Sequence, residues 1–459
     1  YSMVVTDLAN GDARAVYKKL NMDFRNYKRL KMYIHAEAPE GYMLEDNQVS
    51  AFIRIGSDYE DNFYEYEIPL KLTPHGSYTS NSESDRYIVW PEENELNLPL
   101  DVLSECKLQR NEARRKADSD VTLQTIYTIA DPDNNNNRVR IKGNPSIGNV
   151  VVMMMGVRAH GAGTKSAEVW FNELRLTEFN EHGGWAARGR ATVRLADLGV
   201  VQASGQYSSV GFGSIDQSVL ERSMDENKEF DVSASLEVGK LFGPKCRLSL
   251  PTYAGYSRKV STPRYSPYDT DVLLETALAQ ASSKAEEDSI KEMSQTTETI
   301  KSLNFTNVRV KPKQGKKVNM LSASNWTASY SISHTKKTDP ETEYDVTKLI
   351  NGSIGYNYSQ GAKSVQPLKS SGLNSKYFAI IKDVTFYTSP SLLAYRWELD
   401  RDYQEVQKRN VTNPDYLIPL SVTKDFYWNR YFDFRYNITR NLKFGFNAVT
   451  NARIDEPEG

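Results

Sequence analysis

Residues 187–195 read Ala-Arg-Gly-Arg-Ala-Thr-Val-Arg-Leu, an alternation of small or apolar residues with polar ones that decides the fold. Because successive side chains of a β-strand point to opposite faces, the stretch predicts one apolar face and one polar face. The same period returns as far as Val449, and alternation predicts about ten strands after Trp185. The clearest repeats lie at 201–208, 230–238, 326–333, 350–359, 432–438 and 442–448.

The two faces of these strands differ in chemistry. The polar side carries hydroxyl, amide and scattered charged groups, so we predict that it lines a water-filled passage. The residues assigned to this lining are Arg188, Arg190, Arg194, Gln202, Ser204, Gln206, Ser233, Ser235, Thr327, Ser329, Asn351 and Ser353. The apolar side is predicted to face lipid. The residues assigned to it are Val193, Leu195, Phe230, Leu236, Trp326, Tyr330, Ile354, Phe432, Phe434 and Phe444.

The three arginines of the polar face form a basic stripe. It either favours acidic surfaces of a passing molecule or is paired with acids on neighbouring strands, and the sequence leaves both readings open.

A row of such strands is either the wall of a transmembrane barrel or one layer of a soluble sandwich or solenoid. Tight turns at 197–199 and 439–441 alternate with long links at 208–229, 257–302 and 401–425. Outer-membrane barrels have short turns at one end and long loops at the other. Aromatic residues near the strand ends and the hydroxyl-rich opposite face also favour the barrel wall.

Composition limits the other functional classes. The chain has 459 residues and a net charge of −2, which argues against a general binder of nucleic acid or anionic membranes. No apolar run is long enough for a membrane-spanning helix. Cys106 and Cys246 lie in different predicted domains, so we expect two unpaired thiols, with a disulfide as the alternative.

The chain divides into two predicted domains. Residues 1–180 form a β-rich soluble domain with short helices near 12–20 and 97–116, and a sandwich fits it best. Residues 185–450 form the segment of barrel wall. Helical spacing at 271–301 predicts an insertion in a long loop, which packs on the barrel rim or, as the sharper alternative, docks a partner. Residues 451–459 read as a truncated end, and both ends are expected to be cuts from a longer protein.

Chemistry-bearing motifs are scarce. None of the five histidines has metal-ligand spacing, and neither a phosphate loop nor a serine nucleophile elbow occurs. Two acidic stretches, 58–61 and 131–137, are candidate calcium loops, although each lacks the glycine and terminal glutamate of an EF-hand, so a solvated turn is favoured. The sequence therefore predicts a protein that is not an enzyme and has no catalytic, cofactor-binding or metal site.

Eight segments in order resemble the SprA/Sov family, the outer-membrane translocon of the type IX secretion system of Bacteroidetes. They are YKRLKMYIHAEA (27–38), FIRIGSDY (52–59), YEYEIPL (64–70), VWFNELRL (169–176), GGWAA (183–187), GFGSI (211–215), NFTNVR (304–309) and GYNYS (355–359). The resemblance runs over most of this chain but only over part of a family member, which is much longer. It carries over no catalytic residue, and Glu173 and Arg175 of the Asn-Glu-Leu-Arg segment receive only a structural role.

The resemblance implies a very large single-chain barrel in the bacterial outer membrane. Such a protein exports folded cargo with a C-terminal signal domain and is related to gliding motility. Its implied partners are that cargo, a smaller lipid-transporter-like barrel, a periplasmic plug protein and outer-membrane lipid, with no nucleic acid and no cofactor. The side of the membrane occupied by residues 1–180 stays undecided. The alternatives are an outer-membrane receptor or usher-type barrel, or a secreted β-sandwich adhesin.

Overall fold

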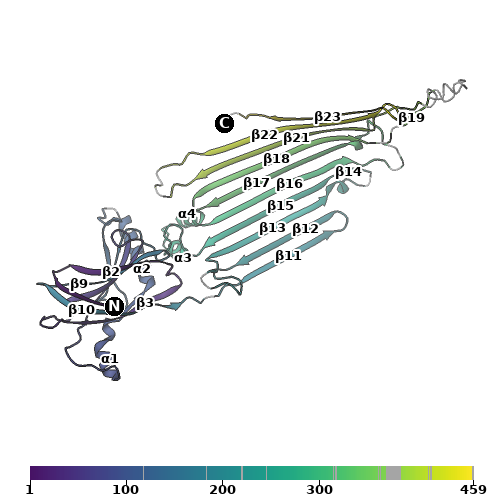
Figure 1. The fold of residues 1–459 in the computed structure, drawn as a ribbon. Coiled ribbons are helices and arrows are strands. Elements are labelled where there is room, and N and C mark those ends of the chain that lie inside the picture. The colour runs from purple at the N-terminus through teal and green to yellow at the C-terminus, as the bar shows by residue number, and fades with distance from the viewer. Residues whose placement is uncertain are drawn as a thin grey trace. The chain divides into compact units, whose positions relative to one another are not determined.

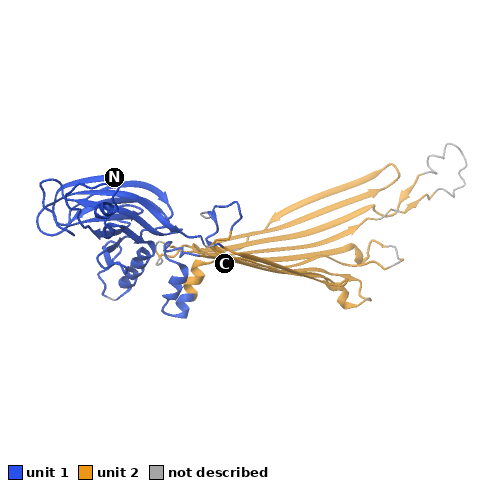
Figure 2. Ribbon diagram, turned by 90° about the horizontal axis from the view of Figure 1, so that it is seen from below, with its two compact units in different colours: residues 1–183, 213–224, 264–287 blue, residues 184–212, 225–263, 288–459 orange. Residues whose placement is uncertain are grey.

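The computed structural model describes residues 1–456 except 117, 182, 219–220, 244, 314, 316–317, 360, 362, 368–383, 412 and 414–415. His182 and the last three residues of the predicted truncated end are thus outside the described residues. The fold is all-β, as predicted, with 53% strand and 12% helix. Two compact units are seen (Figure 2): unit 1 contains residues 1–183, 213–224 and 264–287, and unit 2 contains 184–212, 225–263 and 288–459.

Unit 1 is built on two antiparallel sheets. The smaller has the order β1 (Ser2–Leu8), β10 (Lys165–Phe179), β3 (Tyr27–Glu37) and β6 (Leu96–Pro99). The larger has the order β2 (Ala13–Met22), β9 (Val150–Ala159), β4 (Val49–Gly56), β5 (Phe63–Pro69), β8 (Arg138–Lys142) and β7 (Tyr127–Ala130). The helical elements are α1 (Glu83–Val89), η1 (Glu92–Asn94), α2 (Leu100–Arg115) and α3 (Leu274–Ala279), and α4 (Lys284–Ser294) straddles the boundary with unit 2.

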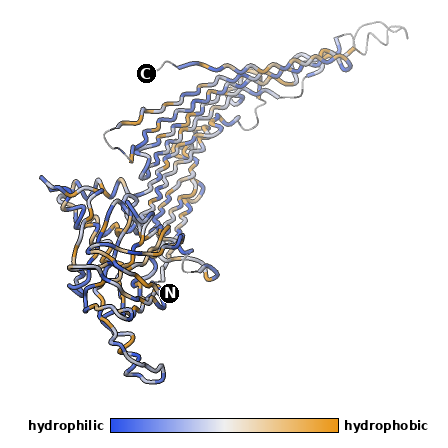
Figure 3. The backbone as a smooth tube through the Cα atoms, turned by 60° about the vertical axis from the view of Figure 1, so that its left-hand side comes forward, coloured by the Kyte–Doolittle hydropathy of each residue, from blue (hydrophilic) through white to orange (hydrophobic). Residues whose placement is uncertain are grey.

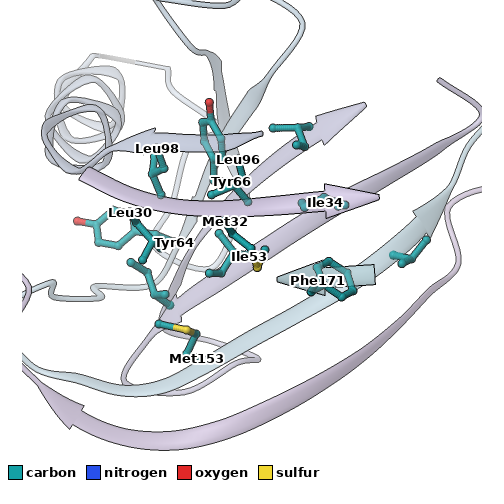
Figure 4. Packing of buried hydrophobic residues seen from close by; sticks show 14 of the residues in the cluster. Leu30, Met32, Ile34, Ile53, Tyr64, Tyr66, Leu96, Leu98, Met153 and Phe171 are labelled. Atoms are coloured by element: carbon teal, nitrogen blue, oxygen red, sulfur yellow. The ribbon is translucent and has the colours of Figure 1, made fainter. Parts of the chain in front are cut away.

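Alternate residues of both sheets in unit 1 supply one buried cluster. Leu30, Met32 and Ile34 of β3 enter it together with Ile53 of β4 and Tyr64 of β5 (Figure 4). The two-residue period read from the sequence therefore gives each strand a core-facing side, and burial of that side drives the packing of unit 1.

The helix predicted at 12–20 is wrong, because these residues form β2, which pairs with β9. Alanine, arginine, lysine and leucine favour a helix locally, but Val16 and Leu20 pack against the core only when the segment is extended. Tertiary pairing thus overrides propensity. The helix predicted at 97–116 is confirmed as α2.

Most of unit 2 is one antiparallel sheet whose main strands follow chain order (Figure 1). Its main path is β11 (Ala186–Leu195), β12 (Gly199–Ser208), β13 (Asp225–Glu237), β15 (Pro251–Pro263), β16 (Thr296–Val310), β17 (Trp326–Asp339), β18 (Thr342–Tyr358), β21 (Leu392–Lys408), β22 (Ser421–Asn437) and β23 (Lys443–Arg453). Within the described residues the sheet is open, since β11 and β23 do not pair, and no closed barrel is seen.

Short elements occupy the connections of unit 2. The strand β14 (Leu248–Ser249) pairs with β16, and β19 (Ser364–Val365) pairs with β20 (Phe386–Tyr387). Two 3-10 turns, η3 (Val238–Phe242) and η4 (Ala323–Asn325), complete them. No helix in the described part of the chain is both long enough and apolar enough to cross a membrane.

The predicted arrangement, with short turns at one end of the sheet and long loops at the other, is only partly present in the structure. In a meander of antiparallel strands successive connections lie at alternate ends, so the tight turns 196–198 and 438–442 share an end with the longer connections 238–250 and 311–325. The opposite end carries the predicted long links but also the two-residue turn 340–341.

The predicted insertion is helical only in part. After α3 and α4 the strand β16 begins at Thr296, so the helical stretch ends before residue 301. The first part of this connection, residues 264–287, belongs to unit 1.

Candidate functional surface on the large sheet

Strand register assigns every residue of unit 2 to one of two faces. Directly paired residues of an antiparallel sheet lie on the same side, so a row of pairs can be followed from strand to strand. One unbroken row runs across seven strands and consists of Val193, Val201, Ala234, Ala254, Leu303, Ile332 and Ile350. We call the side that contains this row the apolar face and the other side the polar face. In Figure 3 hydrophobic and hydrophilic residues alternate along these strands.

The residues predicted to face lipid all lie on the apolar face. Each is exposed or half-buried, so no second layer of the described chain covers them. They are Val193, Leu195, Phe230, Leu236, Trp326, Tyr330, Ile354, Phe432, Phe434 and Phe444.

The residues predicted to line a passage all lie on the polar face. They are Arg188, Arg190, Arg194, Gln202, Ser204, Gln206, Ser233, Ser235, Thr327, Ser329, Asn351 and Ser353. Hydrogen bonds link polar groups across this face. The Asn351 amide donates to the Asp400 carboxylate at 2.7 Å, and the Asn429 amide donates to the same carboxylate at 3.2 Å. The centre of this face is therefore polar and partly acidic.

The basic stripe lies on β11, at the open edge of the sheet. Arg188, Arg190 and Arg194 stand opposite Gln206, Ser204 and Val200. Among the described residues no ion pair involves these three arginines, but Glu229 and Asp231 of β13 lie on the same face, in line with Arg188 and Arg190 across β12. Both readings of the stripe therefore stay open.

The apolar face is hollowed around Gly352. This glycine lies between Tyr330 and Leu399 of the adjacent strands, and a Cβ placed on it would meet no atom within 4 Å. The resulting depression has a volume of about 650 Å³. Its apolar lining comes from Phe305, Val308, Ala328, Tyr330, Ile354, Trp397, Leu399 and Trp428. We call this depression the Gly352 hollow.

A second structural centre lies in unit 1, where Asp271 of the β15–β16 connection is buried. Its carboxylate accepts a hydrogen bond from the Tyr64 hydroxyl and one from Lys107 Nζ at 2.9 Å. Lys107 Nζ also contacts Asp269 Oδ1 at 3.2 Å and donates to the Pro145 carbonyl at 3.0 Å. The side chains of Lys107 and Asp271 are 1% and 0% exposed. Burial, followed by the charge of Asp271, raises the pKa of Tyr64 well above its usual value.

Sequence reasoning missed this buried ion pair, although α2 carried a signal for it. Leu100, Leu103, Lys107 and Arg110 recur at the helical period and are all buried. A buried cation is costly unless it is hydrogen-bonded or paired with an acid. Arg110 accordingly donates a hydrogen bond to the Gly143 carbonyl at 2.6 Å. Nothing comparable marks Asp271 in the sequence.

In both candidate calcium stretches an aspartate carboxylate accepts hydrogen bonds from groups of the protein itself. The Asp58 carboxylate accepts hydrogen bonds from the backbone N–H groups of Glu60, Asp61 and Asn62. Partial burial would raise the pKa of Asp58, but the hydrogen bonds from the Asn62 side chain and these N–H groups lower it to about 2. Asp131 accepts from the Tyr66 hydroxyl at 2.5 Å and from the backbone N–H of Asp133.

The described residues contain no group of three or more His, Cys, Asp or Glu side chains that could hold a metal ion. Both cysteines are free; Cys106 is buried in α2 and Cys246 is exposed. Burial raises the pKa of the Cys106 thiol to about 12.

Glu65 and Glu67 of β5 form ion pairs on the side of the larger sheet of unit 1 that faces away from the buried cluster. Glu65 contacts Arg54, Arg140 and Arg158 at 2.6, 2.7 and 2.9 Å. Burial would raise the pKa of Glu65, but its hydrogen bond with Arg158 and the charges of Arg158 and Arg54 lower it. The pKa of Glu67 is likewise lowered, because hydrogen bonds from His160, Arg140 and Ser50 outweigh burial.

The Asn-Glu-Leu-Arg segment forms a β-bulge in β10. Its register with β3 shifts between Asn172 and Arg175, and Glu173 has φ +52°. A left-handed residue of this kind bends the strand at a bulge. Arg175 then pairs with Glu173 at 2.7 Å and lies over the Tyr33 ring. The segment thus has a structural role in shaping the sheet.

Residues 1–278 match the family model SprA_N, described as a motility related/secretion protein. The matched region includes most of unit 1 and β11 to β15 of unit 2. No curated protein matches the chain.

Proposed function

The chain belongs to the SprA_N family of motility related/secretion proteins, and from this premise we propose that it forms part of the wall of a protein-conducting outer-membrane translocon. In this proposal the sheet of unit 2 is a segment of a very large β-barrel, and unit 1 is a β-sandwich attached to it. The protein exports folded cargo that carries a C-terminal signal domain, in type IX secretion and gliding motility. It acts as a conduit and not as an enzyme.

One observation supports the proposal most strongly: the register places the residues predicted to face lipid on one uncovered face of the sheet and the residues predicted to line a passage on the other. An uncovered apolar face suits lipid, and a face of hydroxyl and amide groups suits a water-filled lumen. Within lipid the open edges of β11 and β23 require further strands, because unpaired backbone groups there are costly. A lumen of this composition offers passing cargo few apolar contacts.

The proposed partners follow from the same reading. They are secreted cargo, a smaller lipid-transporter-like barrel that receives it, a periplasmic plug protein that closes the passage, and outer-membrane lipid. The basic stripe of Arg188, Arg190 and Arg194 would attract acidic cargo surfaces, since none of its arginines forms an ion pair with a described carboxylate.

The decisive experiment places single spin-labelled cysteines in the full-length protein within outer-membrane vesicles. Labels at Ile354 and Phe444 should be accessible to oxygen, whereas labels at Asn351 and Ser353 should be accessible to a water-soluble nickel chelate. If the chelate reaches both sets equally, the proposed orientation of the sheet is wrong.

Transport is tested separately by reversing the basic stripe with Arg188→Glu, Arg190→Glu and Arg194→Glu. Cargo secretion is expected to slow while the amount of assembled protein stays constant. The control replaces the same residues with lysine, which keeps the charge. Normal secretion in the charge-reversed protein would remove the stripe from the mechanism.

A further inference from the structure

The apolar face carries a group of cations near the Gly352 hollow. Lys301, His334 and Lys348 are directly paired across β16, β17 and β18, and Lys336 is the next residue of β17 on the same face. Neighbouring strands are about 4.8 Å apart, so these side chains are close neighbours. We call Lys301, Lys336 and Lys348 the lysine cluster.

None of the three lysines forms a close ion pair with a carboxylate in the part of the chain that the structure describes, although the charge of Lys348 acts on Glu405 of the adjacent strand. The acid nearest in register is Glu405 of β21, which accepts hydrogen bonds from Tyr344 and Tyr403 at 3.0 and 2.8 Å. Lys348 instead lies over the Tyr403 ring, 5.4 Å from its centroid. On the polar face the pattern is different, because Lys337 pairs with Glu298 at 3.1 Å and Arg396 pairs with Glu398 at 3.1 Å.

Like charges on adjacent positions of a sheet destabilise it. Three lysines with a single acid nearby leave an excess of positive charge, which an external anion would balance. The net charge of −2 gives no sign of this local excess, because it sums the charges of all 459 residues.

The chemistry of the anion follows from what lies next to the cluster. The Gly352 hollow lies four residues along β18 from Lys348, a distance of about 13 Å. Tyr330, which lines the hollow, is four residues from His334 on β17. A ligand that satisfies both features has a negatively charged head and an apolar chain. Long lysine side chains at a membrane boundary reach polar headgroups in this way.

We propose that the lysine cluster and the Gly352 hollow form one binding site for a lipid with a phosphate headgroup. The phosphate lies among Lys301, Lys336 and Lys348, and an acyl chain occupies the hollow beside Trp397 and Trp428. The site rests on the proposed function, since the apolar face must meet a bilayer, but it adds a specific lipid to a surface that is otherwise merely apolar.

The test uses the full-length protein, delipidated in a non-ionic detergent and titrated with dioleoyl phosphatidylglycerol or dioleoyl phosphatidylcholine by native mass spectrometry. Phosphatidylglycerol should bind more tightly. Each lysine near an anionic headgroup contributes about a factor of five, so Lys301→Gln, Lys336→Gln and Lys348→Gln together should weaken phosphatidylglycerol about a hundredfold. The matched control is Lys259→Gln, Lys337→Gln and Arg396→Gln on the polar face, which should leave binding unchanged. Equal weakening in both triple variants overturns the proposal.

A second variant separates a lipid from a simple anion. Gly352→Leu fills the hollow without removing a charge, and it should weaken phosphatidylglycerol while glycerophosphate binds as before. If inorganic phosphate or glycerophosphate competes as well as the lipid at equal concentration, the site takes a free anion and the lipid assignment fails.

Fractionation of the same variants distinguishes this failure from failure of the proposed function. Protein that stays in the outer membrane but shows no lipid preference refutes only the lipid site. Protein that is soluble without detergent refutes both.

Discussion

Replacing Lys107 with methionine tests whether the buried ion pair fastens the β15–β16 connection to unit 1. The change preserves most of the side-chain volume but leaves the Asp271 carboxylate, which is 0% exposed, with the Tyr64 hydroxyl as its remaining side-chain donor. Removing one partner of a buried pair costs about 3–5 kcal/mol, because the other charge stays uncompensated in a low-dielectric site.

The connection can avoid this cost by detaching, which exposes Asp271 to water. Backbone hydrogen bonds within the connection, such as Ser266 N–H to the Val272 carbonyl and Leu274 N–H to the Arg264 carbonyl, then exchange with solvent. A cost of about 3–5 kcal/mol lowers the protection of these amides by a hundredfold or more, if detachment is the opening that limits exchange.

Hydrogen exchange of the full-length protein, followed by mass spectrometry, measures this protection in residues 264–274. The control is Lys71→Met, which breaks the exposed pair with Glu93 and should leave stability nearly unchanged, because water already solvates both charges. The double change Lys107→Met with Asp271→Leu removes both charges and should recover most of the protection. Unchanged exchange in Lys107→Met, or a double variant no better than the single one, would refute the reasoning.

Three further predictions concern other parts of the molecule. Ile354→Arg should reduce the free energy of folding into lipid vesicles by about 2–4 kcal/mol if its position is near the midplane, whereas Ser353→Arg on the opposite face should cost less than about 1 kcal/mol, measured by urea titration. The pKa values of Glu65 and Glu67 are lowered in the folded protein, so these carboxylates stabilise it above pH about 4 and lose that effect as the pH falls further. Glu65→Gln should therefore make the stability of unit 1 depend less steeply on pH in acid, measured by circular dichroism. Maleimide should label Cys246 in the native protein and leave Cys106 unmodified, because the thiol of Cys106 is buried and its pKa is raised to about 12; rapid labelling of both contradicts the structure.

The faces of the large sheet could be predicted from sequence because a period of two fixes them. Once a strand holds Phe230 on one side, Ser233 and Ser235 must lie on the other. Where both faces are polar the period carries no signal. The first residues of β16 and the last residues of β21 are such stretches, and both strands extend further than the loops predicted at 257–302 and 401–425 allow. Pairing with the neighbouring strand keeps them extended.

The lysine cluster and the Asp271 anchor could not be predicted because both depend on register or on long-range packing. Lys301 and Lys348 are far apart in the chain, and only the pairing of β16, β17 and β18 brings them beside His334. Asp271 is an ordinary loop acid until the connection places it against Lys107. Local periodicity specifies which face a residue takes, but not which distant residue it meets.

The cations of the apolar face also bear on what covers that face. A second apolar protein sheet packed over it would bury Lys301, Lys336 and Lys348 with Glu405 as the acid nearest in register, and buried charges without a close partner cost several kcal/mol each. A lipid boundary avoids this cost, since the aliphatic stems lie along apolar surface while the ammonium groups reach phosphate and water. Aromatic residues beside the lysines, including Tyr256 and Tyr403, suit the same boundary. If unit 2 were one layer of a soluble sandwich, these charges would lie in a dry core. If its apolar face meets lipid, they lie at a polar boundary instead.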